Sequence, residues 1–459
     1  MTVDDDWRAR AAPELATRLF SRPDGATALP LWADGGRDGT APYAPGRHVL
    51  AAFPDVVERV RVDALAPREL TAWLRARLPT LDPSAAEAPL HALVLAYDAG
   101  RNLEALPATA AEPDPVPDVV YLRYPAFAEA DGEAGPFRTV ARDAAAAARL
   151  EGALAADVAA PSTPRGEPAH GALASSLDEA AHARALATVL AGVAAGDLYQ
   201  ANVARILSAP FPGEATPALF AAMRAANPAA FGALARLDDG LWLASSSPEC
   251  LLRVDAATRE VHSYPIKGTR PRAAAPDDDA RAAAALRADA KDRAEHVMIV
   301  DLVRNDLGRV AVPGSVVVDA LFAAMTLPTV HHLVSDVRGT LRGDADLADL
   351  LTAVFPGGSI TGAPKIAAMA LIEAVEGQRR GYYTGSLGLV RGTGDATFNI
   401  LIRTAVVAGD RVLYGTGGGI VADSDPALEW AETEAKALAF ERALGAVVQR
   451  SIEPRRNER

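Results

Sequence analysis

The chain has 459 residues, 50% of them hydrophobic, and a formal net charge of −13 at pH 7; this length allows two or three domains, or one large fold in two parts, around a substantial core. The acidic balance argues against binding to nucleic acid, whose phosphate backbone selects basic surfaces. The single cysteine, Cys250, excludes an internal disulfide and a cysteine-based zinc site, and no signal-peptide pattern or apolar run of about twenty residues is present, so we expect a cytoplasmic protein without membrane contact.

The first part of the chain carries weak structural signals. Its first 125 residues contain short apolar runs among many prolines, which favours a mixture of strands and helices. The segment "ARDAAAAARLEGALAADVAA" predicts a helix, and "PSTPRGEPAHG" after it predicts an exposed connector. We therefore divide the chain into a divergent N-terminal part over residues 1–175, a second part over residues 176–448, and a charged tail over residues 449–459.

The second part shows clearer patterns. The segment "SLDEAAHARALATVLAGVAAGD" predicts a helix, for which Ser176 is the expected N-cap and Glu179 completes a capping box. Because predicted strands follow one another while helices form separate blocks, we expect an α+β fold. Further long helices are predicted over residues 280–310 and 426–447, and strands over residues 198–210, 232–247 and 381–421.

Two pairs of acidic residues have the same spacing in two predicted helices. Asp292 and Glu295 lie three residues apart, as do Glu429 and Glu432, so each pair shares one helix face. The pairs are either solvated surface charges or face each other around a hard divalent cation. Magnesium prefers oxygen ligands and keeps several waters, so a few carboxylates plus substrate oxygens would hold it. The spacing alone leaves both interpretations open.

A glycine run and two cations also have an ordinary and a functional interpretation. The segment "YGTGGGIVADSDP" either forms a flexible turn or lets the backbone N–H groups of Gly417–Gly419 approach an anion, and it lacks the P-loop and dinucleotide-binding spacings. Arg403, in "FNILIRTAVV", is expected within a strand, where it either needs a buried carboxylate or phosphate partner or lies on a solvated face. Lys267, in "YPIKGTRPR", lies in a predicted loop, where lysines usually face solvent.

Nine segments resemble those of one family, in the same order along the chain. This family uses chorismate and includes anthranilate synthase component I, aminodeoxychorismate synthase component I, and the isochorismate and salicylate synthases. The resemblance is specific over residues 176–445 and weak over the first 125 residues. It implies two packed, mainly antiparallel β-sheets with helices on the outside. The segments are "GDLYQANVAR", "SSSPECLLRV", "PIKGTRPR", "KDRAEHVMIVDLVRNDLGRV", "HHLVSDVRG", "FPGGSITGAPKIAAMALIEAVEG", "RRGYYTGSLG", "FNILIRTAVV" and "GGGIVADSDPALEWAETEAKA".

The resemblance implies roles for residues that would contact the substrate. Glu249 matches the acid that protonates the departing C4 hydroxyl of chorismate, and Tyr383 and Arg403 match the pair that holds a substrate carboxylate. Ser359 stands in place of a common threonine but keeps the hydroxyl. The other substrate contacts that it implies are Gln200, Gly268, Thr269, His332, Gly417, Gly418, Gly419 and Lys436.

The resemblance also implies a magnesium site in the second part. Glu295 and Glu432 match the metal-binding glutamates, with Asp292 and Glu429 in support. Asp292 stands where many anthranilate synthases have glutamate. Magnesium on the ring carboxylate would withdraw electron density as a Lewis acid, while a glutamate of raised pKa delivers the proton to the leaving hydroxyl.

Two positions resemble those that distinguish family members by the group added to the ring. Members that activate water have lysine where this chain has Gln200, and anthranilate synthases have alanine where it has Lys267. The combination of Gln200 with Lys267 resembles the aminodeoxychorismate synthases. A lysine amine that attacks C2 expels the C4 hydroxyl through the conjugated ring, and ammonia attacking C4 then expels the lysine. Lys267 must be neutral for this attack, so we expect its pKa to fall from about 10.4 towards roughly 7–8.

The expected function is therefore that of aminodeoxychorismate synthase component I, a magnesium-dependent enzyme of the transaminase class. No glutaminase-type cysteine turn surrounds Cys250, so the resemblance implies a glutamine amidotransferase subunit as ammonia source, in a heterodimer. No added lyase segment is recognised, so the expected product is 4-amino-4-deoxychorismate, for p-aminobenzoate and folate or for a specialised aromatic pathway. The alternatives are anthranilate synthase component I and a catalytically silent regulatory subunit; the joint presence of Glu249, Lys267, Glu295 and Glu432 argues against the silent subunit.

Overall fold

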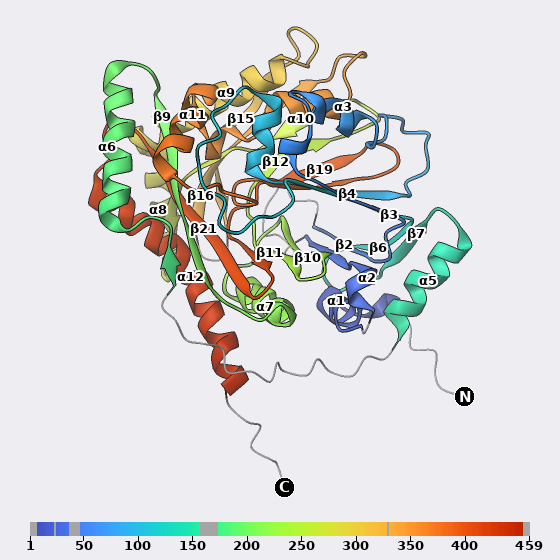
Figure 1. Ribbon diagram of the computed structural model, residues 1–459. Helices are drawn as coiled ribbons and strands as arrows, with labels where there is room; N and C mark the ends of the chain where they lie inside the picture. Colours follow the sequence, from blue (N-terminus) through green and yellow to red (C-terminus); the bar gives the residue numbers. More distant parts are fainter. Residues whose placement is uncertain (1–6, 23, 36–45, 157–172, 328–329, 453–459) are drawn as a thin grey trace.

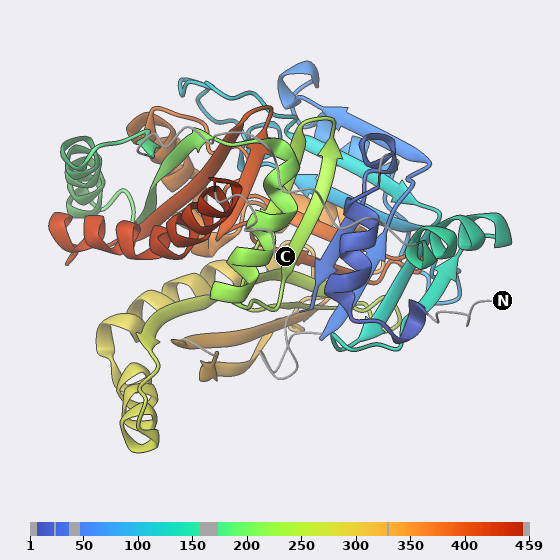
Figure 2. The ribbon, with the colours of Figure 1, turned by 90° about the horizontal axis from the view of Figure 1, so that it is seen from below.

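Two antiparallel β-sheets pack face to face, and helices cover their outer faces (Figure 1, Figure 2). This arrangement confirms the predicted α+β class with helices on the outside. The predicted connector and residues 453–459 of the predicted tail lie outside the described residues. The computed structural model describes residues 7–22, 24–35, 46–156, 173–327 and 330–452.

The larger sheet has 11 strands in the order β17-β9-β21-β20-β11-β10-β1-β2-β6-β7, with β8 also beside β9. β9 and β21 pair continuously, from Pro210 opposite Arg411 to Ala201 opposite Ile420. These strands are β1 Leu31–Asp34, β2 Arg47–Ala51, β6 Ala126–Asp131, β7 Arg138–Ala141, β8 Ala174–Ser175, β9 Gln200–Pro210, β10 Gly232–Asp238, β11 Leu241–Ser245, β17 Gly362–Ala363, β20 Thr404–Ala408 and β21 Arg411–Ile420.

The smaller sheet has 10 strands in the order β14-β16-β13-β12-β19-β18-β4-β5-β3, with β15 also beside β16. Its edge strand β14 pairs with β16 across a register shift between Lys267 and Thr269. These strands are β3 Val56–Val60, β4 Leu90–Leu95, β5 Val119–Tyr124, β12 Cys250–Val254, β13 Glu260–Ser263, β14 Ile266–Pro271, β15 Val317–Thr326, β16 Val330–Thr340, β18 Ser386–Val390 and β19 Ala396–Asn399.

The helices lie on the outer faces of the two sheets. α12 packs against β21, α6 and α7, while α9 packs against β14 and β16 of the smaller sheet. None of the described helices is long and apolar enough to cross a bilayer. The α-helices are α1 Ala12–Phe20, α2 Gly25–Ala28, α3 Glu69–Arg75, α4 Gly100–Leu103, α5 Ala144–Ala155, α6 Glu179–Ala195, α7 Thr216–Ala226, α8 Pro276–Ala288, α9 Ala290–Gly308, α10 Leu347–Val354, α11 Lys365–Glu376 and α12 Pro426–Ile452, and the short 3₁₀ helices are η1 Trp7–Ala9, η2 Val62–Ala64, η3 Tyr97–Ala99, η4 Gly213–Ala215 and η5 Gly358–Ile360.

The main core lies between the sheets. Leu31, Phe127 and Leu243 of the larger sheet join Val94 and Leu387 of the smaller sheet in one buried cluster. Every residue of β4 is buried. This explains why its sequence, "LHALVL", reads as a nearly continuous apolar run rather than an alternating one, because both faces of the strand are covered.

Strands from both sides of residue 175 lie in each sheet. β1 of the first part pairs with β10 of the second, and β4 of the first part pairs with β18 of the second. The sheets therefore run across the predicted boundary. The division of the chain by function at residue 175 stays a prediction.

The predicted N-cap of α6 is wrong. The helix is capped by Asp178, whose side chain accepts a hydrogen bond from the N–H of Ala181. The hydroxyl of Ser176 instead accepts a hydrogen bond from the backbone N–H of Ile206, on β9. Serine and aspartate are both good N-caps, and the tertiary contact with β9 decides between them.

The helix predicted over residues 280–310 is in fact two helices. Asp289 interrupts it with extended backbone (φ −63°, ψ 117°) and caps α9 by accepting a hydrogen bond from the N–H of Asp292. Asp289 is also bound by Arg270 of β14, at 3.0 Å. This contact comes from another element and accompanies the break, so the helical pattern of the sequence does not reveal it.

Candidate active site

Three predicted site residues from three strands meet at one point. Lys267 lies on β14, Gln200 begins β9, and Gly419 lies near the end of β21. A Cβ atom on Gly419 would lie 2.8 Å from Nζ of Lys267 and 2.9 Å from Nε2 of Gln200. Glycine thus leaves the space that these two side chains occupy. Because β14 belongs to the smaller sheet and the other strands to the larger one, the site lies where the sheets meet.

The glycine run is part of β21 and is not a flexible turn. Gly417, Gly418 and Gly419 pair with β9, whereas β20 pairs with β21 only from Arg411 to Tyr414. The carbonyl of Gly417 accepts a hydrogen bond from Nζ of Lys436 at 2.8 Å, so this carbonyl points away from β9. Since residues two apart in a strand point their backbone groups to the same side, the N–H groups of Gly417 and Gly419 point to that side too.

The ammonium group of Lys267 is enclosed by charged residues from several elements. The residue keeps partial exposure, but Nζ is surrounded deeply enough that burial is the main cause of its lowered pKa. Lys436 lowers the pKa further, while Glu295, Glu432 and Glu249 oppose the shift. The lowered pKa agrees with the direction expected for an amine that must lose its proton to act.

Glu249 lies just before β12 and is 4% exposed. Burial raises the pKa of its carboxyl to about 7, although the hydroxyl of Ser359, Lys267 and Arg403 all favour the ionised form. Ser359, in η5, donates a hydrogen bond to Oε1 of Glu249 at 2.7 Å. A carboxyl with this pKa can hold a proton at neutral pH and deliver it to a leaving group.

His332, on β16, is held as a neutral acceptor. Its Nδ1 lies 3.0 Å from the hydroxyl of Thr269 and 3.2 Å from the carbonyl of Gly268, so we assign the ring proton to Nδ1. Burial, with Arg403 adding to it, lowers the pKa of His332 to about 4. Its Nε2 is buried and has no hydrogen-bond partner among the residues that the structure describes. This nitrogen is therefore available to accept a hydrogen bond from a ligand.

Arg403 lies before β20 and not within a strand, so the predicted placement is wrong. Its backbone has φ 51°, a left-handed conformation that is rare outside glycine and is often retained at functional sites. Burial lowers the pKa of its guanidinium, which Tyr414 and Glu249 partly offset. No hydrogen bond or ion pair of this guanidinium is found within the described ranges. An enclosed cation of this kind suits a carboxylate ligand.

Tyr383 lies close to the same tyrosine, Tyr414, which influences the pKa of both Tyr383 and Arg403. Tyr383 is 7% exposed and packs onto β21, where a Cβ on Gly415 would lie 2.0 Å from the ring. Tyr414 was not predicted as a site residue. Its ring stacks on that of Phe440 of α12, with centroids 4.2 Å apart. Its only signal in the sequence was its place as the first residue of the glycine-rich segment.

The carboxylates of α9 and α12 influence one another. Burial raises the pKa of Glu295, and both Asp292 and Glu429 add to this. Burial also raises the pKa of Glu429, with Glu432 adding to it, while the hydroxyl of Ser424 donates a hydrogen bond to Glu429 at 2.6 Å. Like charges from two helices therefore face a common space.

Glu432 and Lys436 form the more open side of this space. Their side chains are 50% and 48% exposed, and Nζ of Lys436 lies 2.6 Å from Oε1 of Glu432. Surrounding protein disfavours ionisation of Glu432, but the attraction of Lys436 lowers its pKa overall. Asp292 has a different main partner, since its Oδ2 lies 2.9 Å from Nη2 of Arg270.

The oxygen donors on α9 and α12 fit magnesium in chemical type. Glu295, Glu429 and Glu432 supply carboxylates whose mutual repulsion a cation would relieve. Across the ranges that the structure describes, however, no three acidic, histidine or cysteine side chains lie close enough to enclose a metal by themselves. This fits a weakly held cation that completes its coordination with water and ligand oxygens.

Comparison with known proteins gives this geometry a family context. The sequence model of the family described as chorismate binding enzyme matches residues 41–442. The chain belongs to the chorismate binding enzyme family. The family match thus begins well before residue 176, in the segment where the sequence resemblance is weak.

Individual relatives carry two different names. A protein named aminodeoxychorismate synthase, from Streptomyces griseus, is 48% identical over 254 residues, which are 55% of this chain and 34% of that protein. A protein named anthranilate synthase component 1 1, from Haloarcula marismortui, is 40% identical over 377 residues, 78% of this chain and 76% of that protein. The chain thus matches about a third of the length of the Streptomyces griseus protein.

A solved structure shows the same fold. The crystal structure of anthranilate synthase component I from Streptococcus pneumoniae superposes with a TM-score of 0.75 and 24% sequence identity, covering 87% of this chain and 92% of that chain. The predicted architecture of the family, two packed antiparallel sheets with outer helices, is thereby confirmed.

Proposed function

We propose that this chain is aminodeoxychorismate synthase component I, which converts chorismate and ammonia to 4-amino-4-deoxychorismate and water. One observation carries the proposal: Nζ of Lys267 is enclosed, with a lowered pKa, against Gly419 and beside Gln200. The related protein of Streptomyces griseus, named aminodeoxychorismate synthase, supports the same assignment. The relative from Haloarcula marismortui favours the second candidate, anthranilate synthase component I.

Lys267 acts as the nucleophile in the proposed reaction. Its neutral amine forms a bond to C2 of chorismate, the ring π electrons shift, and the C–O bond at C4 breaks. The lysine nitrogen gives its extra proton to water once the bond has formed, and Glu249 recovers a proton from water. Ammonia then bonds to C4, the electrons shift back, and the C2–N bond to Lys267 breaks. The added ammonia gives its surplus proton to the departing lysine nitrogen, which leaves as the neutral amine and restores the enzyme. The same enclosure that lowers the pKa of Lys267 favours the neutral amine that this attack requires.

Glu249 supplies the proton that lets the C4 hydroxyl leave as water. Hydroxide is a poor leaving group, so the transfer of this proton is worth a factor of about 10²–10⁴ in rate. Ser359 holds one carboxyl oxygen of Glu249 in place through its 2.7 Å hydrogen bond. The reaction therefore needs a protonated Glu249 and a neutral Lys267, whereas the isolated side chains are ionised. Burial favours the uncharged form of both groups.

The remaining polar groups bind and orient chorismate. Arg403 offers an enclosed guanidinium for one carboxylate, with Tyr383 close by, and Nε2 of His332 accepts a hydrogen bond from a ring hydroxyl. Glu295 and Glu432, with Glu429, would hold magnesium beside the other carboxylate. The bound ion would act there as a Lewis acid that draws electron density from the ring.

Ammonia would come from a glutamine amidotransferase partner, and free ammonium at high concentration would replace it in an assay. The experiment that tests the proposal is identification of the product formed from chorismate, magnesium and ammonium. We expect 4-amino-4-deoxychorismate. Fluorescent anthranilate would establish the second candidate instead, and the absence of any chorismate turnover would favour the silent regulatory subunit.

Ser359→Ala should shift the pH profile of the reaction upward. The hydroxyl of Ser359 lowers the pKa of Glu249, so its removal raises that pKa and keeps the acid protonated to higher pH. We expect the alkaline limb of kcat/KM for chorismate to move up by about one pH unit, the value of one hydrogen bond to a charged group. Ser359→Thr, which keeps the hydroxyl, is the control. An unchanged limb in the alanine variant would contradict the assignment.

Gly418→Ala should weaken the response to magnesium. A Cβ there would lie 3.0 Å from Oε2 of Glu429, close enough to displace this carboxylate slightly, and 3.6 Å from Oε1 of Glu432, an ordinary contact. Small shifts around metal ligands cost about 10–100-fold in affinity, so the magnesium concentration for half-maximal activity should rise by at least about tenfold. Gly445→Ala is the control, because a Cβ there meets nothing within 4 Å. If both variants needed the same magnesium concentration for half-maximal activity, the result would argue against this site.

A further inference from the structure

A buried ion pair lies next to the candidate site and has no part in the proposed chemistry. Arg380 and Glu376 have side chains that are 1% and 5% exposed. Arg380 donates from Nη2 to one carboxyl oxygen of Glu376 at 2.6 Å and from Nε to the other at 2.9 Å. Such a pair adds little net stability over well-packed apolar residues, because both charges lose their hydration. Its presence therefore calls for a further role.

Arg380 binds three separate segments of the chain, two through backbone carbonyls and one through a side-chain hydroxyl. Nη1 of Arg380 donates to the carbonyl of Ile360 at 2.9 Å and to the hydroxyl of Thr384 at 3.2 Å. Nη2 donates to the carbonyl of Asn202 at 2.9 Å. One guanidinium thereby connects η5, the loop before β18 and strand β9.

Each of these segments carries a residue of the proposed site. Ile360 follows Ser359, Thr384 follows Tyr383, and Asn202 comes two residues after Gln200. Glu376 strengthens the contact with β9, since it accepts a hydrogen bond from the N–H of Ala204 at 2.8 Å. The pair thus holds the chain within two residues of three predicted substrate contacts.

Gln200 depends most on this support. It is 0% exposed, and neither its amide nitrogen nor its amide oxygen has a hydrogen-bond partner within the described part of the chain. No side-chain partner in these ranges fixes its amide, so the position of β9 sets where the amide lies. Arg380 and Glu376 hold β9 at Asn202 and Ala204, directly after it.

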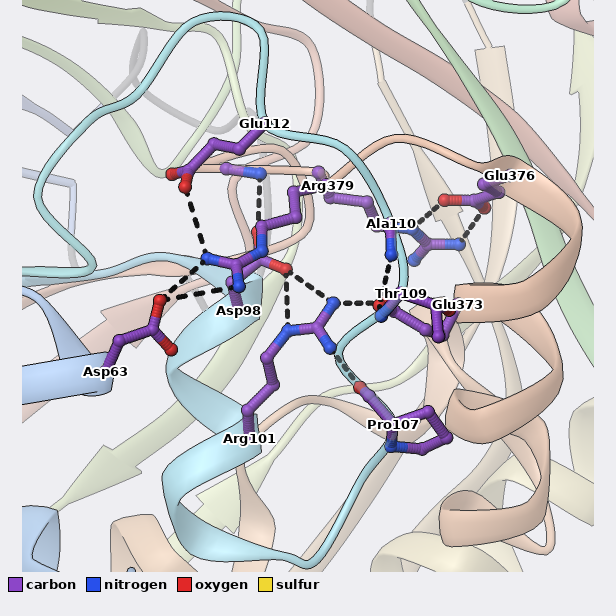
Figure 3. A network of polar contacts seen from close by, with 12 residues as sticks. Asp63, Asp98, Arg101, Pro107, Thr109, Ala110, Glu112, Glu373, Glu376 and Arg379 are labelled. Atoms are coloured by element: carbon purple, nitrogen blue, oxygen red, sulfur yellow. Dashed lines mark hydrogen bonds and ion pairs between the residues drawn. The ribbon is translucent and has the colours of Figure 1, made fainter. Parts of the chain in front are cut away.

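Residues of the first part of the chain also contact the loop before β18. The guanidinium of Arg380 lies over the ring of Tyr97, 4.6 Å from its centroid, and Asp98 accepts a hydrogen bond from the N–H of Gly381 at 2.8 Å. Figure 3 shows the surrounding network, in which Arg101 contacts both Asp98 and Glu373 of α11. The segment that follows α11 is therefore held on two sides.

We propose that Arg380, anchored by Glu376, is a positioning residue that sets the relative placement of Gln200, Ser359 and Tyr383. The inference rests on chorismate being the substrate, as in the proposed function, but not on which product forms. Loss of the Arg380 side chain should displace Tyr383, which weakens substrate binding, and Gln200, which slows turnover. It should also loosen the Ser359–Glu249 hydrogen bond, which a purely stabilising residue would leave intact.

The test is the kinetics of Arg380→Lys with chorismate, magnesium and ammonium. Lysine keeps the charge facing Glu376 but cannot reach three segments at once. We expect kcat/KM for chorismate to fall at least about tenfold, with changes in both KM and kcat, and the alkaline limb to move upward as in Ser359→Ala. Thr384→Val removes one acceptor while keeping the branched side chain, and should mainly raise KM.

Arg379→Lys is the matched control. Arg379 is the neighbouring arginine and is also ion-paired, with Asp63 at 3.4 Å and Glu112 at 3.2 Å, but these ion pairs reach none of the three segments (Figure 3). Its kinetics should match those of the unmodified protein. A folded Arg380→Lys protein with unchanged kcat/KM and pH profile would overturn the inference. If Arg380→Lys does not fold, an unchanged KM in Thr384→Val would overturn it.

The two proposals fail in different ways. The product that the unmodified protein forms decides the proposed function. The role of Arg380 is decided by a different quantity, the ratio of kcat/KM for chorismate between the variant and the unmodified protein. This ratio is measured as chorismate consumed, so it holds for either product. If the unmodified protein turns over no chorismate, calorimetric binding of chorismate gives the ratio, and equal affinities would overturn the positioning role.

Discussion

Lys267→Ala should lose at least about 10³-fold of the rate of 4-amino-4-deoxychorismate formation, because the covalent route through C2 is removed. The alanine variant should admit ammonia at C2 in place of the missing amine, since the sequence resemblance implies alanine at this position in anthranilate synthases. A low yield of fluorescent anthranilate is then expected. Full activity of Lys267→Ala would exclude Lys267 as the nucleophile.

The covalent intermediate itself gives a direct measurement. With chorismate and magnesium but no ammonia, the intact mass of the protein should rise by that of chorismate minus water. The chain contains only the lysines Lys267, Lys291, Lys365 and Lys436, so peptide mapping can place the adduct without ambiguity, between Tyr264 and Arg270.

The controls for the adduct separate the nucleophile from its neighbours. Lys291→Ala should keep the adduct, because Lys291 is 53% exposed and pairs only loosely with Glu295, at 3.9 Å. Gln200→Ala should also keep it, while Glu249→Ala should suppress it, since hydroxide would then have to leave without a proton. An adduct on another lysine would contradict the mechanism.

Glu249→Gln should lower kcat by about 10²–10⁴-fold, because glutamine fills the same space but has no proton to give. The limb of the pH profile that reflects a pKa of about 7 should disappear with it. Glu441→Gln, at an exposed position on α12, is the control and should behave like the unmodified protein. Retention of both the rate and the limb near pH 7 would exclude Glu249 as the acid.

The same substitution should stabilise the folded protein at alkaline pH. Burial raises the pKa of Glu249 from 4.5 to about 7, so the native state binds a proton more tightly than the unfolded chain. Stability is therefore lost as pH rises between these values, by about 3 kcal/mol in total. Glu249→Gln removes this loss, so urea unfolding should show a gain at about pH 8 that disappears below about pH 4.5. Equal stability at both pH values would contradict the raised pKa.

The sequence could predict the fold class and the strands and helices with regular patterns. The strand over residues 198–210 and the final helix from residue 426 appear nearly as expected, because their apolar spacing is local information. Arg403 shows the limit of such reasoning. Its apolar neighbours favour a strand, but Arg403 has a left-handed backbone conformation at which the chain turns. No local sequence pattern predicts this conformation.

The candidate site was predictable in residue types but not in contacts. The shared helix face of Asp292 and Glu295 was visible from their spacing, yet the pairing of Asp292 with Arg270 depends on how β14 lies against α9. Glu376 and Arg380 lie in two of the segments that resemble the family, but nothing in the sequence assigned them a role. Four residues apart, they look like an ordinary surface pair, and only the fold encloses them.

The sharing of both sheets across residue 175 has a consequence for the chain as a folding unit. Without residues 1–175, β10 would lose β1 and β18 would lose β4, so each sheet would end in an uncovered edge. Uncovered edges with apolar faces pair with other chains and aggregate. We therefore expect a chain truncated at residue 175 to aggregate rather than to give a smaller active enzyme. The two parts should instead recover activity when produced as separate fragments and refolded together, by restoring the missing strand pairs.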